Sequence, residues 1–403
     1  MRNLEETLLW EIFYHPQVAR SELARLFNVS AATISRSSNL LLARRLILET
    51  GASSASRGRR PTLLRVNPEL ARVAGIELDR DRITAVISDL GAKLLGRGAI
   101  AASVGDPVRT MVSHCRKAMS MALADAGLRS GEISRIGVGH TGTLDVEHGL
   151  CLAWEGAPHW RRVNLLAILR KTFKTEITLD DRARAVALVQ YLLWPESRRH
   201  RSAIYVHIGT GVGAGIFVNG RLLRGVTLAG GEIGHMVIDR NGPPCACGRR
   251  GCVEAFSSLG ATMARVRQGF DGGAKTSLRR LAKSASQLSM DMVVAAARDG
   301  DPLARTALTE AADALAIGIA NAVQLLNPSL VVLAGKFANA AREFFLTAVT
   351  RTIRGECFET LSRALEIRMA PFRKDAGPIG CALLAAHDVV ADLIQRSFFV
   401  PAS

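Results

Sequence analysis

The sequence predicts an α/β protein of two lobes, preceded by an all-α segment that ends in a short β wing. Three observations support this fold class. Apolar residues recur at helical spacing from residue 4 to residue 45. Strand and helix patterns then alternate, as in the strand 133–139 that follows a helix near 106–126. The 403 residues, 48% of them hydrophobic, are enough for two or three domains with substantial cores.

The first predicted element is a helix-turn-helix within residues 1–66. One helix follows a cap at Ser21, and residues 28–30 form a tight turn before the next helix at 31–45. In such a motif the start of the second helix enters the major groove of DNA. The residues expected to face DNA there are Ala32, Thr33, Arg36 and Ser37. The alternative is a three-helix packing module without DNA contact.

A β wing is predicted next, with strands at 46–48 and 62–66 around a basic loop. The loop carries Arg57, Gly58, Arg59 and Arg60, which suit a narrow minor groove because the negative potential there is enhanced. Residues 1–65 contain ten arginines and five glutamates, a net charge of +5, within a chain of net charge +16. This excess of positive charge favours double-stranded DNA as a partner.

A metal site is predicted where one histidine and three cysteines lie within eighteen residues. His235, Cys245, Cys247 and Cys252 supply the four N and S ligands that a structural Zn²⁺ requires. The alternative is three buried thiols and a surface histidine. The remaining four cysteines are scattered and show no paired framework. With no secretory leader and no apolar run of about 18 residues, we expect a cytoplasmic protein without a membrane.

Several motifs together resemble the ROK family, which groups sugar kinases with sugar-responsive transcription repressors. They are GVGHTG at 137–142, the region of Trp160, GTGVGAGIFVNG at 209–220, GEIGH at 231–235, CACGRRGCVE at 245–254, VVLAG at 331–335 and AGPIGCALLA at 376–385.

The resemblance implies an actin-like, ribonuclease-H-like sugar-kinase fold behind the winged helix-turn-helix domain. The expected domains are 1–66 for DNA binding, 67–195 for the first lobe and 196–403 for the second lobe with the zinc knuckle. The C-terminal helix can pack back on the first lobe. A ligand is expected between the lobes. Because a repressor with one such motif per chain binds paired half-sites, a homodimer or homotetramer is expected.

Two positions favour the repressor branch of the family over the kinase branch. The family's kinases place Gly-Gly-Thr after the strand 71–78 to hold nucleotide phosphates, whereas this chain has Asp79, Arg80 and Asp81, whose carboxylates repel phosphate. Aligning the family's Asn-Asp pair with 177–194 places Asp181 on the asparagine and Arg182 on the catalytic aspartate. Arginine, with a pKa above about 12, is no base. ATP is therefore not expected, although a shift of one residue would restore Asp181 as the base.

The sugar site implied by the resemblance is partly kept. Glu232, His235 and Glu254 match positions that hold sugar hydroxyls in the family, and carboxylates suit this role because each oxygen accepts hydrogen bonds. Alternatively, the two glutamates support the zinc loop.

Arg182 leaves two interpretations open. It recognises an anionic ligand such as a sugar phosphate or sugar acid, or it is held by an internal ion pair with Asp181 or Asp180.

We therefore expect a transcriptional regulator, a repressor of carbohydrate uptake or metabolism genes, controlled by a sugar or sugar derivative and without kinase activity. The alternatives are an ATP-dependent sugar kinase that also binds DNA, a regulator that responds to no ligand, and a zinc-stabilised interaction protein.

Overall fold

A computed structural model describes residues 4–51, 62–371 and 374–398. Its internal contacts divide the chain into two compact units. Unit 1 comprises Met1–Leu152, Gly156–Arg198 and Asp375–Ser403, and unit 2 comprises Ala153–Glu155 and Arg199–Lys374. The C-terminal helix therefore lies in unit 1, although it is distant in sequence from the rest of that unit.

The N-terminal segment of unit 1 consists of short helices followed by an antiparallel pair of strands. Its elements are α1 (Leu4–Tyr14), β1 (Val18–Ala19), α2 (Arg20–Phe27), α3 (Ala31–Ala43), β2 (Ile47–Thr50) and β3 (Leu63–Val66). The turn between α2 and α3 is tight because Asn28 adopts a left-handed backbone conformation, with φ 53°. Ser30 then caps α3 by accepting a hydrogen bond from the backbone N–H of Thr33 at 3.1 Å. Leu23, Ile34 and Leu41 are fully buried between these helices.

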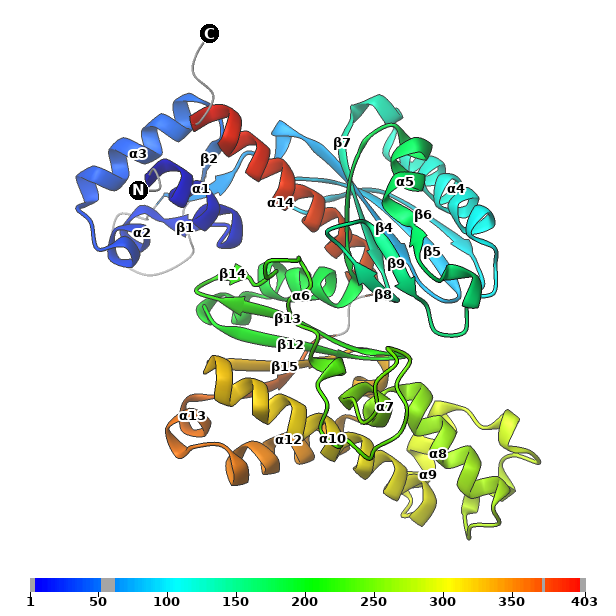
Figure 1. Cartoon of the computed structure of the whole chain (residues 1–403). Helices are drawn as coiled ribbons and strands as arrows, with labels where there is room; N and C mark the ends of the chain where they lie inside the picture. Colours follow the sequence, from blue (N-terminus) through cyan, green and yellow to red (C-terminus); the bar gives the residue numbers. More distant parts are fainter. Residues whose placement is uncertain (1–3, 52–61, 372–373, 399–403) are drawn as a thin grey trace. The chain divides into compact units, whose positions relative to one another are not determined.

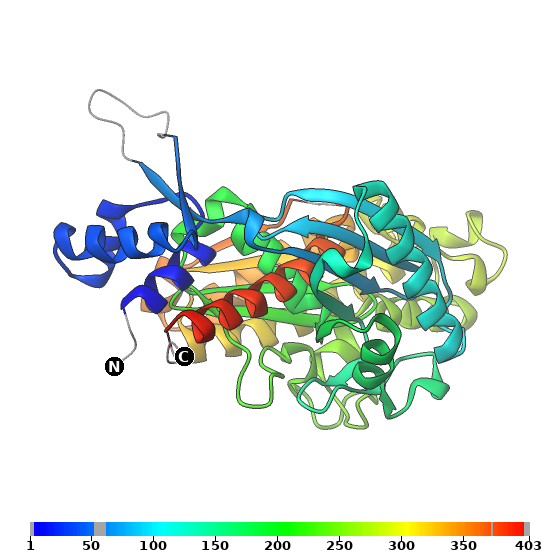
Figure 2. The ribbon, with the colours of Figure 1, turned by 90° about the horizontal axis from the view of Figure 1, so that it is seen from above.

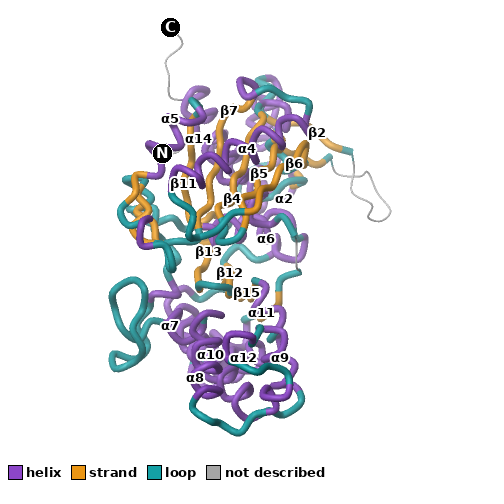
Figure 3. The backbone as a smooth tube through the Cα atoms, turned by 90° about the vertical axis from the view of Figure 1, so that its right-hand side faces the viewer, coloured by secondary structure: helices purple, strands orange, loops and turns teal. Residues whose placement is uncertain are grey.

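The remainder of unit 1 is built on a five-stranded sheet of order β11-β7-β4-β5-β6. Its elements are β4 (Arg72–Leu78), β5 (Arg82–Asp89), β6 (Leu94–Ala101), α4 (Val108–Ala126), β7 (Ile133–His140), β8 (Thr143–Asp145), β9 (Leu150–Ala153), β10 (Val163–Asn164), α5 (Leu165–Phe173), β11 (Glu176–Asp181), α6 (Arg182–Leu193) and α14 (Ala376–Phe398). Strands β4, β5 and β6 are antiparallel, whereas β7 and β11 run parallel to β4. Helix α4 packs over β5 and β6 (Figure 3). Strands β8, β9 and β10 form a separate small sheet.

Helix α14 lies directly on the first sheet. A Cβ atom at Gly75 of β4 would overlap the carbonyl oxygen of Pro378, and one at Gly137 of β7 would overlap that of Cys381. Glycine at these two positions therefore permits the close approach of helix and sheet. Among the described helices, α14 alone is long and apolar enough to cross a membrane by composition, but 67% of that stretch is buried. Its apolar character is accounted for by this packing.

Helix α14 also carries the N-terminal segment, which lies beside its far end in two views (Figures 1 and 2). The indole of Trp10 packs against the imidazole of His387, with ring centroids 4.6 Å apart and ring planes tilted by 35°. The guanidinium of Arg44 donates a hydrogen bond to the backbone carbonyl of Ser397 at 3.1 Å. Helix α6 contributes a second anchor, because the hydroxyl of Tyr191 lies 3.0 Å from Nε2 of His15. The N-terminal segment is thus attached to both α14 and α6.

Unit 2 repeats the same strand arrangement, with a sheet of order β14-β13-β12-β15-β16. Its elements are β12 (Ala203–Ile208), β13 (Val212–Val218), β14 (Arg221–Leu222), α7 (Val253–Ser257), α8 (Leu259–Asp271), α9 (Met290–Arg298), α10 (Pro302–Leu326), β15 (Leu330–Ala334), α11 (Lys336–Ala340), α12 (Arg342–Glu356), α13 (Glu359–Ala364) and β16 (Glu366–Met369). Helices α8, α9, α10 and α12 gather together (Figure 3). Helices α10 and α12 share the most extensive helix contact, and the core contains Val206, Val331, Leu315 and Phe345.

Short 3-10 helices occur in the connections of both units. They are η1 (Pro68–Leu70), η2 (Ser130–Glu132), η3 (Pro158–Trp160), η4 (Pro195–Arg199), η5 (Ile233–His235), η6 (Ser277–Arg280) and η7 (Ala285–Gln287).

Candidate metal centre and ligand site

The four predicted metal ligands of unit 2 converge in space. The ligand atoms of His235, Cys245, Cys247 and Cys252 all lie within 4.8 Å of one another. Sγ of Cys245 is 3.7 Å from Nδ1 of His235, and Sγ of Cys247 is 3.7 Å from Sγ of Cys252. A tetrahedron with Zn–S bonds of about 2.3 Å has edges of about 3.8 Å. The spacing therefore fits a single tetrahedral ion.

The loop that holds the cysteines folds by backbone hydrogen bonds and two glycines with positive φ. The N–H of Cys245 donates to the carbonyl of Arg249 at 2.8 Å, and that of Gly248 donates to the carbonyl of Cys245 at 3.0 Å. Gly248 and Gly251 have φ of 90° and 69°, a conformation that strains other residues. A Cβ at Gly251 would also overlap the carbonyl of Asp239. The glycines are thus required to bring the thiols together.

The thiol of Cys247 is prepared for metal binding. Burial acts to raise its pKa, but hydrogen bonds from Arg249 and from the neighbouring thiols lower the pKa to about 6. Because the thiolate is the form that binds a metal, the lowered pKa of Cys247 favours metal binding.

Glu232 and Glu254 flank the metal ligands in sequence. Glu232 is exposed and precedes η5, and its carbonyl accepts a hydrogen bond from the N–H of His235 at 3.0 Å. Glu254 lies on α7, two residues after Cys252, and its Oε2 accepts a hydrogen bond from the N–H of Val212 at 2.8 Å. The same oxygen would lie 2.7 Å from a Cβ at Gly211. One carboxylate oxygen of Glu254 therefore holds the glycine-rich turn between β12 and β13.

Arg182 in unit 1 is held by an internal ion pair. Its Nη1 lies 3.1 Å from Oδ2 of Asp79 and 3.4 Å from Oε1 of Glu77, and the Arg182 side chain is only 18% exposed. The sequence had suggested Asp180 or Asp181 as partners, and Glu77 and Asp79 were not anticipated. Asp180 pairs with buried Arg184 at 2.6 Å, and Asp181 caps α6 by accepting a hydrogen bond from the N–H of Ala183 at 2.6 Å.

The ion pair joins the two positions on which the expectation of a regulator without kinase activity was based. Asp79 closes the hairpin between β4 and β5, and Arg182 is the first residue of α6. Glu77 was missed by the sequence analysis, although a lone carboxylate inside the apolar strand 71–78 is a signal. Desolvation raises the pKa of Glu77, with Asp79 acting in the same direction, and Arg182 opposes this shift. The Arg182 guanidinium therefore compensates carboxylates of its own chain.

The residues predicted to face DNA divide into two groups. Ala32, Thr33 and Arg36 are exposed at the start of α3. Ser37 was expected to join them, but it is only 4% exposed, and its hydroxyl donates a hydrogen bond to Oε1 of Glu5 at 2.8 Å. The reason for this correction is helical periodicity, because Ser37 lies three residues after buried Ile34 and shares its face. The predicted wing residues Arg57, Gly58, Arg59 and Arg60 lie outside the described residues.

Comparisons with known proteins identify relatives of two kinds. The ROK family profile matches residues 73–388. The xylose repressor of Caldicellulosiruptor bescii is 26% identical over 377 residues, which are 93% of each chain. A glucokinase of Thermotoga maritima is 30% identical over 251 residues, which are 62% of this chain and 78% of the glucokinase. A solved ROK family transcriptional regulator, described as a homologue of the Escherichia coli MLC protein, superimposes with a TM-score of 0.73 at 24% identity and covers 98% of both chains.

Proposed function

The chain belongs to the ROK family, and on that premise we propose that it is a DNA-binding transcriptional regulator controlled by a carbohydrate and devoid of kinase activity. In this proposal it represses genes of carbohydrate uptake or metabolism. It acts in the cytoplasm as a homodimer or homotetramer on double-stranded operator DNA. Zn²⁺, held by His235, Cys245, Cys247 and Cys252, serves structure rather than chemistry.

The observation that carries the proposal is the helix-turn-helix segment in front of the family region. Residues 4–51 and 62–66 precede the matched region 73–388 and end in the strand pair β2 and β3. The similarity to the xylose repressor covers 93% of the chain and must therefore include part of this segment. The similarity to the glucokinase covers only 62% of the chain. Thr33 and Arg36 are exposed near the start of α3. In a helix-turn-helix, the start of the second helix contacts the base edges.

The ion pair of Arg182 supports the absence of kinase activity. A kinase needs a base at the sugar hydroxyl, and the guanidinium of Arg182, which is paired with Glu77 and Asp79, cannot accept a proton. The second candidate, a kinase that also binds DNA, is favoured by the retained glycine-rich turn at 209–211 and would use Asp181 as base.

The two candidates are separated by one assay. The protein is mixed with ATP and each of a panel of hexoses, pentoses and amino sugars, and ADP is measured. The regulator releases no ADP above the rate without sugar, whereas sugar-dependent turnover that is lost in Asp181→Asn would establish the kinase.

Effector binding is proposed at Glu232, His235 and Glu254. Each glutamate can accept hydrogen bonds from sugar hydroxyls, and His235 offers its second ring nitrogen because Nδ1 faces the metal cluster. Because Arg182 is already paired with carboxylates, we propose a neutral sugar rather than a sugar phosphate. Calorimetric titration tests this: a neutral sugar should bind, with affinity lowered in Glu254→Gln. Tight binding of the phosphate ester alone would contradict it.

Within unit 1, a route from the Arg182 ion pair to the DNA-binding segment is proposed along α6. The helix begins at Arg182 and carries Tyr191 near its end, a distance of about 14 Å at 1.5 Å per residue. Tyr191 is fully buried and contacts His15 of the segment that carries α2 and α3. A ligand that binds two positions of α6 with different affinity would therefore shift the position of the recognition helix.

A further inference from the structure

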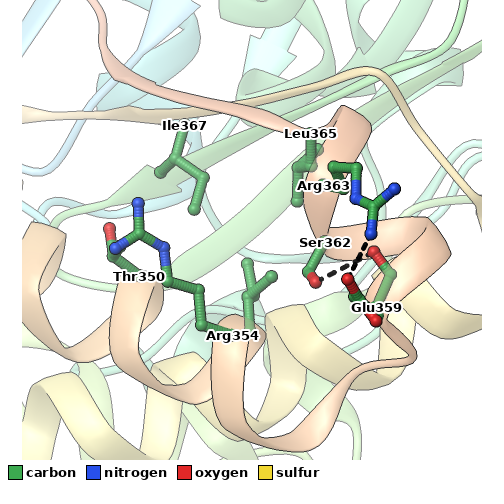
Figure 4. Close-up of a pocket in the computed structure, with 8 residues that line it drawn as sticks. Thr350, Arg354, Glu359, Ser362, Arg363, Leu365 and Ile367 are labelled. Atoms are coloured by element: carbon green, nitrogen blue, oxygen red, sulfur yellow. Dashed lines mark hydrogen bonds and ion pairs between the residues drawn. The ribbon is translucent and has the colours of Figure 1, made fainter.

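A cavity of about 430 Å³ lies in unit 2 between α12, α13 and β16 (Figure 4). Its floor is apolar. Ile353 of α12 belongs to the core of the unit and is almost fully buried, and Leu365 and Ile367 pack against that core. The hydroxyl-bearing side chains of Thr350 and Ser362 also line the cavity. The cavity thus combines an apolar floor with groups that donate hydrogen bonds.

Two arginines line the same cavity and outnumber its carboxylates. Arg354 comes from α12 and Arg363 from α13, and Figure 4 shows their side chains on opposite sides of the cavity. Across the described ranges of the chain, Arg354 forms no ion pair. Among the described lining residues Glu359 supplies the one carboxylate, and it pairs with Arg363. Two guanidinium groups and one carboxylate give the lining a net charge of +1, which favours an anion.

The ion pair with Glu359 does not prevent Arg363 from binding a ligand. Both side chains are more than three-quarters exposed, and ion pairs at such exposure are weak. Nη2 of Arg363 donates to Oε1 of Glu359, whereas a guanidinium has five N–H groups. The carboxylate of Glu366 is bound by two other arginines. It precedes Ile367 on β16 and therefore points to the opposite face of the strand.

We propose that this cavity binds a small molecule that carries a phosphate group on an apolar body. A carboxylate has two oxygens in one plane, and a single guanidinium can bind both. A phosphate monoester instead presents three terminal oxygens, which suits two guanidinium groups on opposite sides together with two hydroxyls. The apolar floor then holds the remainder of the ligand.

The proposed phosphate site is distinct from the proposed effector site. Glu232, His235 and Glu254 are not among the residues that line this cavity. Arg182, the cation considered for an anionic effector, is paired with two carboxylates, whereas the cations of this cavity exceed its carboxylates. The inference does not rest on the proposed function, because phosphate binding is measured without sugar or DNA.

The test is titration of the purified zinc-loaded chain with phenyl phosphate, followed by broadening of its phosphorus NMR signal. Phenyl phosphate should bind. Inorganic phosphate should bind at least about fivefold more weakly, because it leaves the apolar floor uncovered. Benzoate carries a carboxylate in place of the phosphate and should displace phenyl phosphate poorly.

Substitutions in the cavity have effects of opposite sign. Arg354→Gln and Arg363→Gln should each weaken binding of phenyl phosphate at least about 10-fold, because each removes charge-assisted hydrogen bonds. Glu359→Gln should strengthen it, since the carboxylate competes for Arg363 and repels the ligand. The matched control is Arg351→Gln, which removes the same charge from α12 at a residue outside the cavity lining. Its affinity should stay within about twofold of wild type.

Three outcomes would overturn the proposal. They are wild-type protein that does not bind phenyl phosphate, benzoate that binds as tightly as phenyl phosphate, and an equal loss of affinity in Arg351→Gln and Arg354→Gln. The last result would show attraction by the net charge of +16 rather than a site. Circular dichroism establishes that each variant is folded. None of these outcomes bears on the sugar and DNA assays, so the proposed function stands or fails separately.

Discussion

Replacing Arg182 by alanine should destabilise unit 1 in a manner that depends on pH. The substitution leaves Glu77 and Asp79 together without their shared cation, and Glu77 is only 15% exposed. Breaking a fully buried pair costs about 3–5 kcal/mol, whereas an exposed pair contributes about 0.2–1 kcal/mol. Because Arg182 and Glu77 are mostly but not fully buried, we expect Arg182→Ala to lower the free energy of unfolding by about 2 kcal/mol near neutral pH.

The sign of the pH dependence follows from Glu77. Its folded pKa is raised above the ordinary value of 4.5 even with Arg182 present. The folded state then binds the proton more tightly than the unfolded state, so Glu77 opposes folding increasingly as pH rises from the unfolded pKa through the folded one. Arg182→Ala removes a contribution that lowers this pKa. The pH range over which ionisation of Glu77 destabilises the folded state therefore extends to higher pH in the variant. The free energies of unfolding of variant and wild type should differ least in acid and most above the pKa of Glu77 in the variant.

The assay is urea unfolding of wild type and variant across pH 5 to 8, followed by tryptophan fluorescence. The matched control is Arg170→Ala, because Arg170 is 53% exposed and forms a looser pair of 3.6 Å with Glu176; its cost should stay below about 1 kcal/mol at every pH. In a Glu77→Gln background the cost of Arg182→Ala should fall. An Arg182→Ala variant as stable as the control, with no trend in pH, would refute a stabilising ion pair of Arg182 with Glu77 and Asp79.

Three further perturbations have defined outcomes. Cys247→Ser should lose the bound zinc, measured by elemental analysis, and lower the unfolding temperature of unit 2, since structural zinc contributes folding energy directly; a stable metal-free wild type would contradict this. Arg36→Ala should weaken binding to operator DNA by about 1–3 kcal/mol if Arg36 contacts a base, as measured by fluorescence anisotropy. Ser37→Ala should instead lower the free energy of unfolding by about 1 kcal/mol, because it removes the hydrogen bond to Glu5, as measured by thermal unfolding. Loss of DNA binding in Ser37→Ala but not in Arg36→Ala would contradict both assignments. Tyr191→Phe removes the hydrogen bond to His15. It should reduce the change in DNA affinity that sugar causes and leave the affinity for sugar within about twofold of wild type. An unchanged effect of sugar on DNA affinity would exclude this contact from the route along α6.

The elements with strong local signals were predicted well from the sequence. The helices of the N-terminal segment, the strand that ends at 78 and the convergence of His235 with three cysteines follow from periodicity and ligand spacing, which are local properties of the chain. The cap predicted at Ser21 was wrong, because the N-cap of α2 is Ala19 and Ser21 lies inside the helix. The position of α14 was predicted only as an option, because its packing on β4 and β7 depends on glycines that are hundreds of residues away in sequence.

Contacts between distant segments were the ones that local sequence signals did not reveal. The ion pair of Arg182 was expected with its neighbours Asp180 and Asp181, whereas Glu77 and Asp79, its partners in the structure, come much earlier in the chain. Glu77 lies at the end of β4 and Asp79 follows that strand, and the sheet order brings β4 beside β7 and β7 beside β11, the strand that leads into α6. Ser37 was assigned to the outer surface because its chemistry suits DNA, while the register of α3 turns it inward. Residue type suggests a role, but long-range packing decides whether the side chain is accessible.

The central claim, a sugar-responsive regulator of DNA, is tested most directly by capture of genomic fragments. The purified protein is incubated with sheared DNA of its own organism at about 0.15 M salt, where weak phosphate contacts are screened, and the bound fragments are sequenced with and without sugars. The account predicts a few enriched inverted repeats beside carbohydrate genes and a change in their recovery with one neutral sugar. No enrichment under any condition, together with sugar-dependent release of ADP from ATP, would contradict it.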